Sequence, residues 1–585
     1  MLEFAHALAW PAELFVAVWP WYMWLQVLGF AALPFVFTRC GRLSDRGYGL
    51  AKGFGLVMTA FFAWLIAFLP PGTGPGFTFE GVAAATLIVG LLSVVSLLSS
   101  LGAFIDFIRM RWRLILLHEA VMLAAFCTML LFRAQIPQIT HVISDSAAEK
   151  FTDFGVLNGL LQSTTFPPSD PWVSGFTMNY YYFGHFMWAC IIKLSGIVPE
   201  VGFNAALATI FALVCVQSFS LGFNATSRLG YGFLAMFLVA LASNIDGALQ
   251  LVAIVSERVS GTAARAPWFL GYDFWRSSRA VENTITEFPA FSFVLGDLHA
   301  HLSALVIFLA GLLLALQIGR SISAEGYLLR YELRNVDELF CAALITGALF
   351  AANSWDAITY SAVLVVVIWT AQSARKRDPS GRDPRPPAAP GAKVLLAIET
   401  LMLVAIIGMV GVFGLFYQFV NNFRSPFSTA ITWMSRWPFL TVENWPIRVV
   451  QSANHTSPLE FLSHWAIIGA APVALLVWLV LRLGRQRAVR AGRIAKVPGE
   501  KFWALLLFAA ACVVVLAIVL QGWIAAACLV AAVSILLVLA TTEPPPAIRL
   551  LAGLMTVFFG LSFFCEVFYF NDIFSGAIER INTVF

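Results

Sequence analysis

Apolar runs of about 20 residues recur from one end of this sequence to the other, and a helix of about that length crosses the hydrocarbon layer of a bilayer. Of 585 residues, 60% are hydrophobic and 12% are charged, whereas roughly a quarter of a typical soluble domain is charged. The runs are continuous and do not alternate with polar residues, which excludes a transmembrane β-barrel. The sequence therefore predicts an all-α, polytopic integral membrane protein.

About fourteen segments have the length and hydropathy of membrane spans. They are residues 15–38, 50–69, 81–105, 114–133, 201–223, 229–254, 291–318, 338–352, 355–372, 393–418, 463–483, 502–521, 523–541 and 549–569. One more apolar stretch, residues 180–198, would disturb the alternation of loops downstream if it were a span. We therefore expect it to be a re-entrant or interfacial helix, covered by protein or a wet cavity.

Lysine and arginine gather in four loops, which the positive-inside rule assigns to the cytoplasm. Their basic residues lie within 39–52, 109–113, 373–392 and 482–501. This orientation places the N-terminus outside, in the cell (inner) membrane. The long loops 134–179, 255–290 and 419–462 lie outside as well, so we expect the catalytic face to be extracytoplasmic.

The chain is expected to have four parts. They are N-terminal helices (1–113), a core with the large outer loops (114–372), a basic cytoplasmic loop (373–392) and C-terminal helices (393–585).

The first outer loop carries Glu149 and Asp153 four residues apart. On a helix these two carboxylates share a face, and the proximity of like charges raises one pKa, as suits a general base. An ordinary solvated loop explains the pattern as well. Tyr180, Tyr181 and Tyr182 follow, with His185 close behind; these rings are candidates for substrate binding, and an aromatic belt at the membrane interface explains the tyrosines equally.

The second outer loop carries Arg276 and Arg279, whose forked donors suit a phosphate. Asp297, His299 and His301 come next, at the expected mouth of a span. Asp297 and His301 would share a helix face and could hold Mg²⁺ or Mn²⁺; a polar helix cap is the alternative. An ionisable side chain in an apolar span costs free energy, so we treat these three residues as functional candidates.

Three further positions complete the candidate set, namely Asn353, Asp356 and Arg424, which adjoin predicted spans. Inside the spans, His118, Glu119 and Asp246 are ionisable, and either structural pairing or an ion path accounts for them. Nothing in the sequence suggests nucleic acid binding.

Several long motifs in the sequence resemble one family. They are FTDFGVLNGLL, FPPSDPW, NYYYFGHF, EFPAFSFVLGDLHAH, NSWDAITY and ERINTVF. Together they resemble the YYY-motif multi-pass membrane protein family over residues 114–585. That family is poorly characterised, so the resemblance implies no reaction. The family pattern continues past Phe585, so we expect a shortened member, an incomplete chain or a partner chain that supplies the missing C-terminal helices.

A looser resemblance concerns topology. A basic cytoplasmic loop, a helix, an outer loop with paired acids, a proline-rich turn and an aromatic run are similar to the entry of GT-C glycosyltransferases. This resemblance implies transfer of a hexose or pentose from a polyprenyl-phosphate carrier in the membrane to an unidentified acceptor outside. It implies Asp153 as the base, with Glu149 as the second acid.

Two other classes of function stay open. A transporter would use the re-entrant segment 180–198 and the intramembrane ionisable residues, although no inverted repeat is found. A non-enzymatic scaffold or assembly protein is the other alternative.

Overall fold

The structure is a computed structural model. It describes residues 2–135, 137–139, 149–260, 272–282, 284–325, 335–373, 390–424, 447–450, 454–467, 469, 512–513, 515, 522–541 and 546–570. The chain forms two compact units, Met1–Leu241 with Ser292–Phe423, and Ala242–Phe291 with Arg424–Phe585. The four-part division of the sequence stays a prediction.

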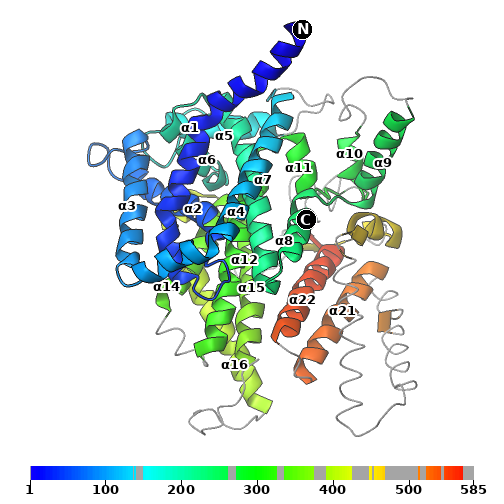
Figure 1. Cartoon of the computed structure of the whole chain (residues 1–585). Coiled ribbons are helices and arrows are strands. Elements are labelled where there is room, and N and C mark those ends of the chain that lie inside the picture. The colour runs from blue at the N-terminus through cyan, green and yellow to red at the C-terminus, as the bar shows by residue number, and fades with distance from the viewer. Residues whose placement is uncertain are drawn as a thin grey trace. The chain divides into compact units, whose positions relative to one another are not determined.

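The first unit is a bundle of helices, drawn from blue to yellow-green in Figure 1. Its elements are α1 (Leu2–Arg39), α2 (Tyr48–Ala67), α3 (Phe79–Leu97), α4 (Leu101–Gln135), α5 (Lys150–Gln162), α6 (Phe183–Ser195), α7 (Pro199–Thr226), α8 (Leu229–Met236) with the π-helical η1 (Phe237–Leu241), α12 (Ala300–Glu325), α14 (Val336–Ala352), α15 (Ser354–Ser373), α16 (Pro390–Gly408) with η3 (Met409–Leu415), and α17 (Tyr417–Asn422).

The second unit contains α9 (Ile245–Val259), α10 (Phe274–Ser277), α21 (Trp523–Thr541) and α22 (Pro546–Val567). Two short strands, β1 (Ile447–Val449) and β2 (Phe568–Phe570), pair antiparallel with Ile447 opposite Phe570. The short helix α11 (Pro289–Leu295) contains the boundary between the units.

Nine helices within the described residues are long and apolar enough to cross a membrane, or ten if the broken pair Leu229–Leu241 and Ile245–Val259 counts as one span. The nine match predicted spans, so the prediction of an all-α polytopic membrane protein is confirmed. The predicted spans 463–483 and 502–521 lie largely outside the described residues.

Helix α6 is the segment that we expected to be re-entrant or interfacial. Its 13 residues extend about 20 Å, which is too short to cross the hydrocarbon layer. Nearly all of its side chains are buried, because α1, α2, α3, α5, α7, α12 and α14 contact it. The apolar sequence of α6 thus reflects burial inside the bundle.

Three sequence expectations about local structure are wrong. Residues 109–113 lie within the 35-residue helix α4 and form no loop. The predicted span 291–318 is interrupted between α11 and α12, where Gly296 has a φ of 73°; no other residue type adopts that backbone readily. The predicted span 229–254 is interrupted between Leu241 and Ile245.

Helices α1 and α2 approach closely at Gly55. A Cβ atom at this position would lie 2.5 Å from the carbonyl oxygen of Leu28 and 2.9 Å from Cβ of Ala32. We therefore expect Gly55→Ala to lower the thermal unfolding temperature in detergent, because overpacking of a core costs about 1–3 kcal/mol. Gly90→Ala in α3 is the matched control, since its Cβ would meet no atom within 4 Å. Equal unfolding temperatures for the two variants would contradict this packing.

Candidate functional site

Helix α5 carries the two acidic candidates of the first outer loop. Asp153 points inward with Lys150, Leu157 and Leu160, all of which are buried. Glu149 directly precedes the helix, and its side chain is 64% exposed whereas that of Asp153 is 0% exposed. The two acids therefore occupy different environments, although the side chains of both reach one histidine.

His185 of α6 holds the Asp153 carboxylate from one side. Its Nε2 lies 3.0 Å from Oδ1 of Asp153, and both side chains are fully buried. Helix α6 is fixed against α12 by Trp188, whose indole donates to Oγ of Ser303 at 2.9 Å. Gly184 permits this approach, since a Cβ there would lie 2.6 Å from Cβ of Ser303. The position of His185 thus follows from helix packing.

His299 connects the buried acid to the exposed one. Its Nδ1 lies 3.5 Å from Oδ1 of Asp153, and its Nε2 lies 3.2 Å from Oε2 of Glu149. The hydroxyl of Tyr180 is 3.2 Å from Nδ1. The His299 side chain is 26% exposed. Four residues from three chain segments therefore form a continuous polar path from solvent to Asp153.

Electrostatics favour the ionised form of Asp153. Burial alone would raise the pKa of Asp153, but the charge of His299 and the hydrogen bond with His185 outweigh burial and hold that pKa below its usual value. Burial and the nearby carboxylates raise the pKa of Tyr180 well above its usual value, so its hydroxyl keeps its proton.

The expectation that Asp297 and His301 share a helix face is wrong. Helix α12 begins at Ala300. Asp297 lies outside this helix, directly after the turn at Gly296, whereas His301 lies within the helix. The His301 ring lies 5.1 Å from the ring of His299, and its Nε2 lies 3.4 Å from Oγ of Ser292. Among the described residues, no group of three or more metal-ligating side chains is in place to hold an ion. The geometry therefore gives no support to Mg²⁺ or Mn²⁺ bound by Asp297 and His301.

The three consecutive tyrosines have three different environments. Tyr180 belongs to the site. The Tyr181 ring packs against Phe423 with centroids 5.1 Å apart. Tyr182 is buried, and its hydroxyl accepts a hydrogen bond from Nε1 of Trp64 at 3.1 Å. Of the tyrosines, only Tyr180 contacts the histidine–carboxylate cluster through a bond that the described structure shows.

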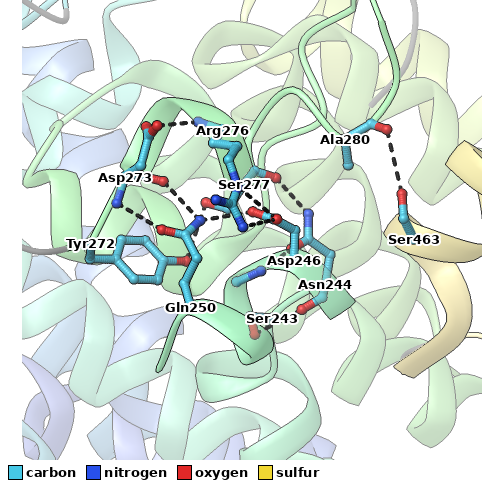
Figure 2. Close-up of polar contacts among 11 residues, drawn as sticks. Ser243, Asn244, Asp246, Gln250, Tyr272, Asp273, Arg276, Ser277, Ala280 and Ser463 are labelled. Atoms are coloured by element: carbon cyan, nitrogen blue, oxygen red, sulfur yellow. Dashed lines mark hydrogen bonds and ion pairs between the residues drawn. The ribbon is translucent and has the colours of Figure 1, made fainter. Parts of the chain in front are cut away.

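Arg276 and Arg279 belong to the second unit, and Figure 2 shows the neighbourhood of Arg276. Arg276 donates from Nε and Nη2 to Oδ1 of Asp246, at 2.8 and 2.6 Å. Nη1 of Arg279 donates to the carbonyl and hydroxyl oxygens of Ser278. The guanidinium of Arg276 is therefore already engaged by a carboxylate, which argues against its prediction as a phosphate ligand.

The remaining candidates are accounted for locally. Asn353 donates from Nδ2 to Oδ2 of Asp356 at 3.0 Å, where α14 meets α15. Arg424 is exposed after α17. The intramembrane acids and histidine pair with neighbours: Glu119 with Lys52, Asp246 with Arg276, and His118 with Asp45.

The comparison with family models matches residues 54–585 to DUF2298, described as an uncharacterized membrane protein. The chain belongs to this family. Neither the comparison with curated proteins nor that with solved structures finds a match. The family confirms the expectation of a poorly known multi-pass membrane protein lineage, and the YYY-motif name and the GT-C resemblance stay unsupported by these comparisons.

Sequence reasoning on this DUF2298 chain missed two cations beside the site. Arg133, in the last turn of α4, and Lys150, at the start of α5, are 1% and 2% exposed. Arg133 ended a predicted span, where a basic residue is expected to flank the membrane, and Lys150 sat among acids in what looked like a solvated loop. No local signal identifies either residue as buried.

The contact between Asp153 and His185 predicts an energetic coupling. The free energy of unfolding in detergent would be measured for Asp153→Asn, for His185→Gln and for the double variant. The two changes should be coupled by about 1–3 kcal/mol, because replacements of residues in direct contact do not have additive effects on stability. Asp153→Asn combined with Ser96→Ala is the control, since the Ser96 hydroxyl, as far as the described residues show, donates only to the carbonyl oxygen of Leu92 in its own helix. Additivity of the first pair would contradict the described contact.

Proposed function

We propose that this protein is a membrane glycosyltransferase that moves a sugar from a polyprenyl-phosphate donor to an acceptor on the extracytoplasmic side of the cell membrane. A GT-C-like architecture of about fourteen spans with the N-terminus outside is part of the proposal. The observation that carries it is the path from exposed Glu149 through His299 to fully buried Asp153. This arrangement can accept a proton from a bound hydroxyl.

The proposed reaction begins with a hydroxyl of the acceptor. As its oxygen attacks the anomeric carbon, its proton passes to Nε2 of His299, and the proton on Nδ1 moves toward Asp153. The bond from the anomeric carbon to the phosphate oxygen breaks, and polyprenyl phosphate leaves with that electron pair. Asp153 acts through His299 because its own carboxylate is fully buried, and it stabilises the imidazolium that forms.

The environment of the cluster supports a proton-transfer role. Asp153 Oδ2 is buried and has no hydrogen-bond partner among the described residues. An unsatisfied buried oxygen is costly to stability, and such costs are typical of functional sites.

Replacement of Asp153 tests the proposal. In purified protein supplied with polyprenyl-phosphate hexoses or pentoses, we expect Asp153→Asn to reduce release of polyprenyl phosphate by about 10²–10⁴-fold, because the base His299 loses the carboxylate that orients it and stabilises its imidazolium. Asp170→Asn is the control, because this acid of the same outer loop accepts, within the described residues, only backbone hydrogen bonds from Trp172 and Val173. Near-native turnover by Asp153→Asn would remove Asp153 from the mechanism.

A further inference from the structure

Arg133 is a buried cation whose hydrogen-bonding capacity is only partly used. Its Nε donates to Oδ1 of Asn204 at 3.1 Å, whereas its Nη2 is buried with no hydrogen-bond partner among the described residues. Asn204 is neutral, and its Nδ2 donates to the carbonyl oxygens of Pro137 and Glu200. Asn204 therefore orients the guanidinium without neutralising its charge.

The guanidinium of Arg133 lies against Gly296. A Cβ at Gly296 would lie 2.1 Å from Nη1 and 2.4 Å from Cζ of Arg133. Glycine is thus required twice here, once for the φ of 73° and once for the space that the guanidinium occupies. The next residue is Asp297, which is close enough to Asp153 to affect its pKa, so Arg133 adjoins the proposed catalytic cluster.

Lys150 is the second cation at this place. It lies on the inward face of α5, one helical turn before Asp153. The pKa of Lys150 is lowered to about 8, chiefly by burial and also by the charge of Arg133, while the charge of Asp297 opposes the shift. Neither Arg133 nor Lys150 forms an ion pair with a carboxylate in the described part of the chain. Burial of two cations that repel each other destabilises the folded protein unless an anion binds beside them and compensates their charge.

The local charges leave room for an anion. The carboxylate of Asp153 is engaged by His185 and His299, both at Oδ1, and the charge of Asp297 acts on Lys150. One carboxylate, Asp297, beside two cations does not match the charges of both Arg133 and Lys150. An oxyanion that accepts from Nη2 of Arg133 and from the Lys150 ammonium would match them.

We propose that Arg133 and Lys150 form a buried binding site for a phosphoryl oxyanion beside Asp153, in which Gly296 packs against the Arg133 guanidinium. The anion site stands on its own geometry, and only its assignment to the lipid-linked phosphate of the sugar donor rests on the proposed function. It replaces Arg276 as the candidate phosphate ligand.

The test is ligand-dependent thermal stabilisation of the full chain in detergent. The probes are polyprenyl phosphate, inorganic phosphate, and neutral polyprenol as the control for the tail. We expect polyprenyl phosphate to raise the unfolding temperature of the unmodified protein and polyprenol to leave it unchanged. Stabilisation by inorganic phosphate as well would identify the phosphoryl group alone as sufficient, whereas stabilisation by polyprenyl phosphate only would identify a lipid headgroup.

Lys150→Gln should weaken the apparent affinity for polyprenyl phosphate by about 10–100-fold, the value of one charge-assisted hydrogen bond, and Lys150→Arg should restore much of it. Lys193→Gln is the matched control, because this half-buried lysine of α6 donates to the carbonyl oxygen of Leu161. Arg133→Gln, if it folds, should weaken binding similarly. Affinity unchanged in Lys150→Gln, or no stabilisation of the unmodified protein by either phosphate probe, would overturn the site.

The transferase proposal and the anion-site proposal can be disproved independently of each other. If Asp153→Asn abolishes turnover while Lys150→Gln keeps its affinity, the anion site is wrong and the transferase stands. If phosphate binds as expected but Asp153→Asn turns over normally, the anion site stands and the assignment of Asp153 is wrong.

Discussion

A fully buried carboxylate constrains everything around it. Asp153 has no exposed surface, and an isolated charge in that position would be prohibitively costly. The costs are offset by His185 from α6 and His299 from the turn before α12. The tight α6–α12 contact and the left-handed Gly296 both serve this arrangement, because each brings a partner of Asp153 into place.

A second buried acid in the same unit shows what a purely structural role looks like. Asp45 is fully buried. Its Oδ1 accepts from the backbone of Gly47, and its Oδ2 accepts from the backbone of Gly49 and the hydroxyl of Ser220. Satisfied networks of this kind make a core rigid and specific. The Asp153 cluster differs, because Asp153 Oδ2 and Arg133 Nη2 have no hydrogen-bond partners in the part of the chain that the structure describes, and such exceptions call for a functional explanation.

The sequence predicted the membrane class and several members of the site, because those depend on composition and on local spacing. Glu149, Asp153, Tyr180, His185 and His299 were all candidates and do lie together. The sequence could not predict that the helix before His299 ends near Gly296, since isolated glycines also occur within helices. It also could not separate Arg133 and Lys150 from ordinary flanking cations, or Arg276 from its partner Asp246, because burial and pairing are set by contacts between distant segments.

The most direct test of the account is an experimental structure of the full chain with a bound polyprenyl-phosphate sugar. The account predicts density for the phosphate against Nη2 of Arg133 and the Lys150 ammonium, and for the sugar beside His299 and Asp153. A donor bound at another surface, with the Asp153 cluster closed to it and Arg133 neutralised by a protein carboxylate, would contradict the central claim that this cluster is the functional site.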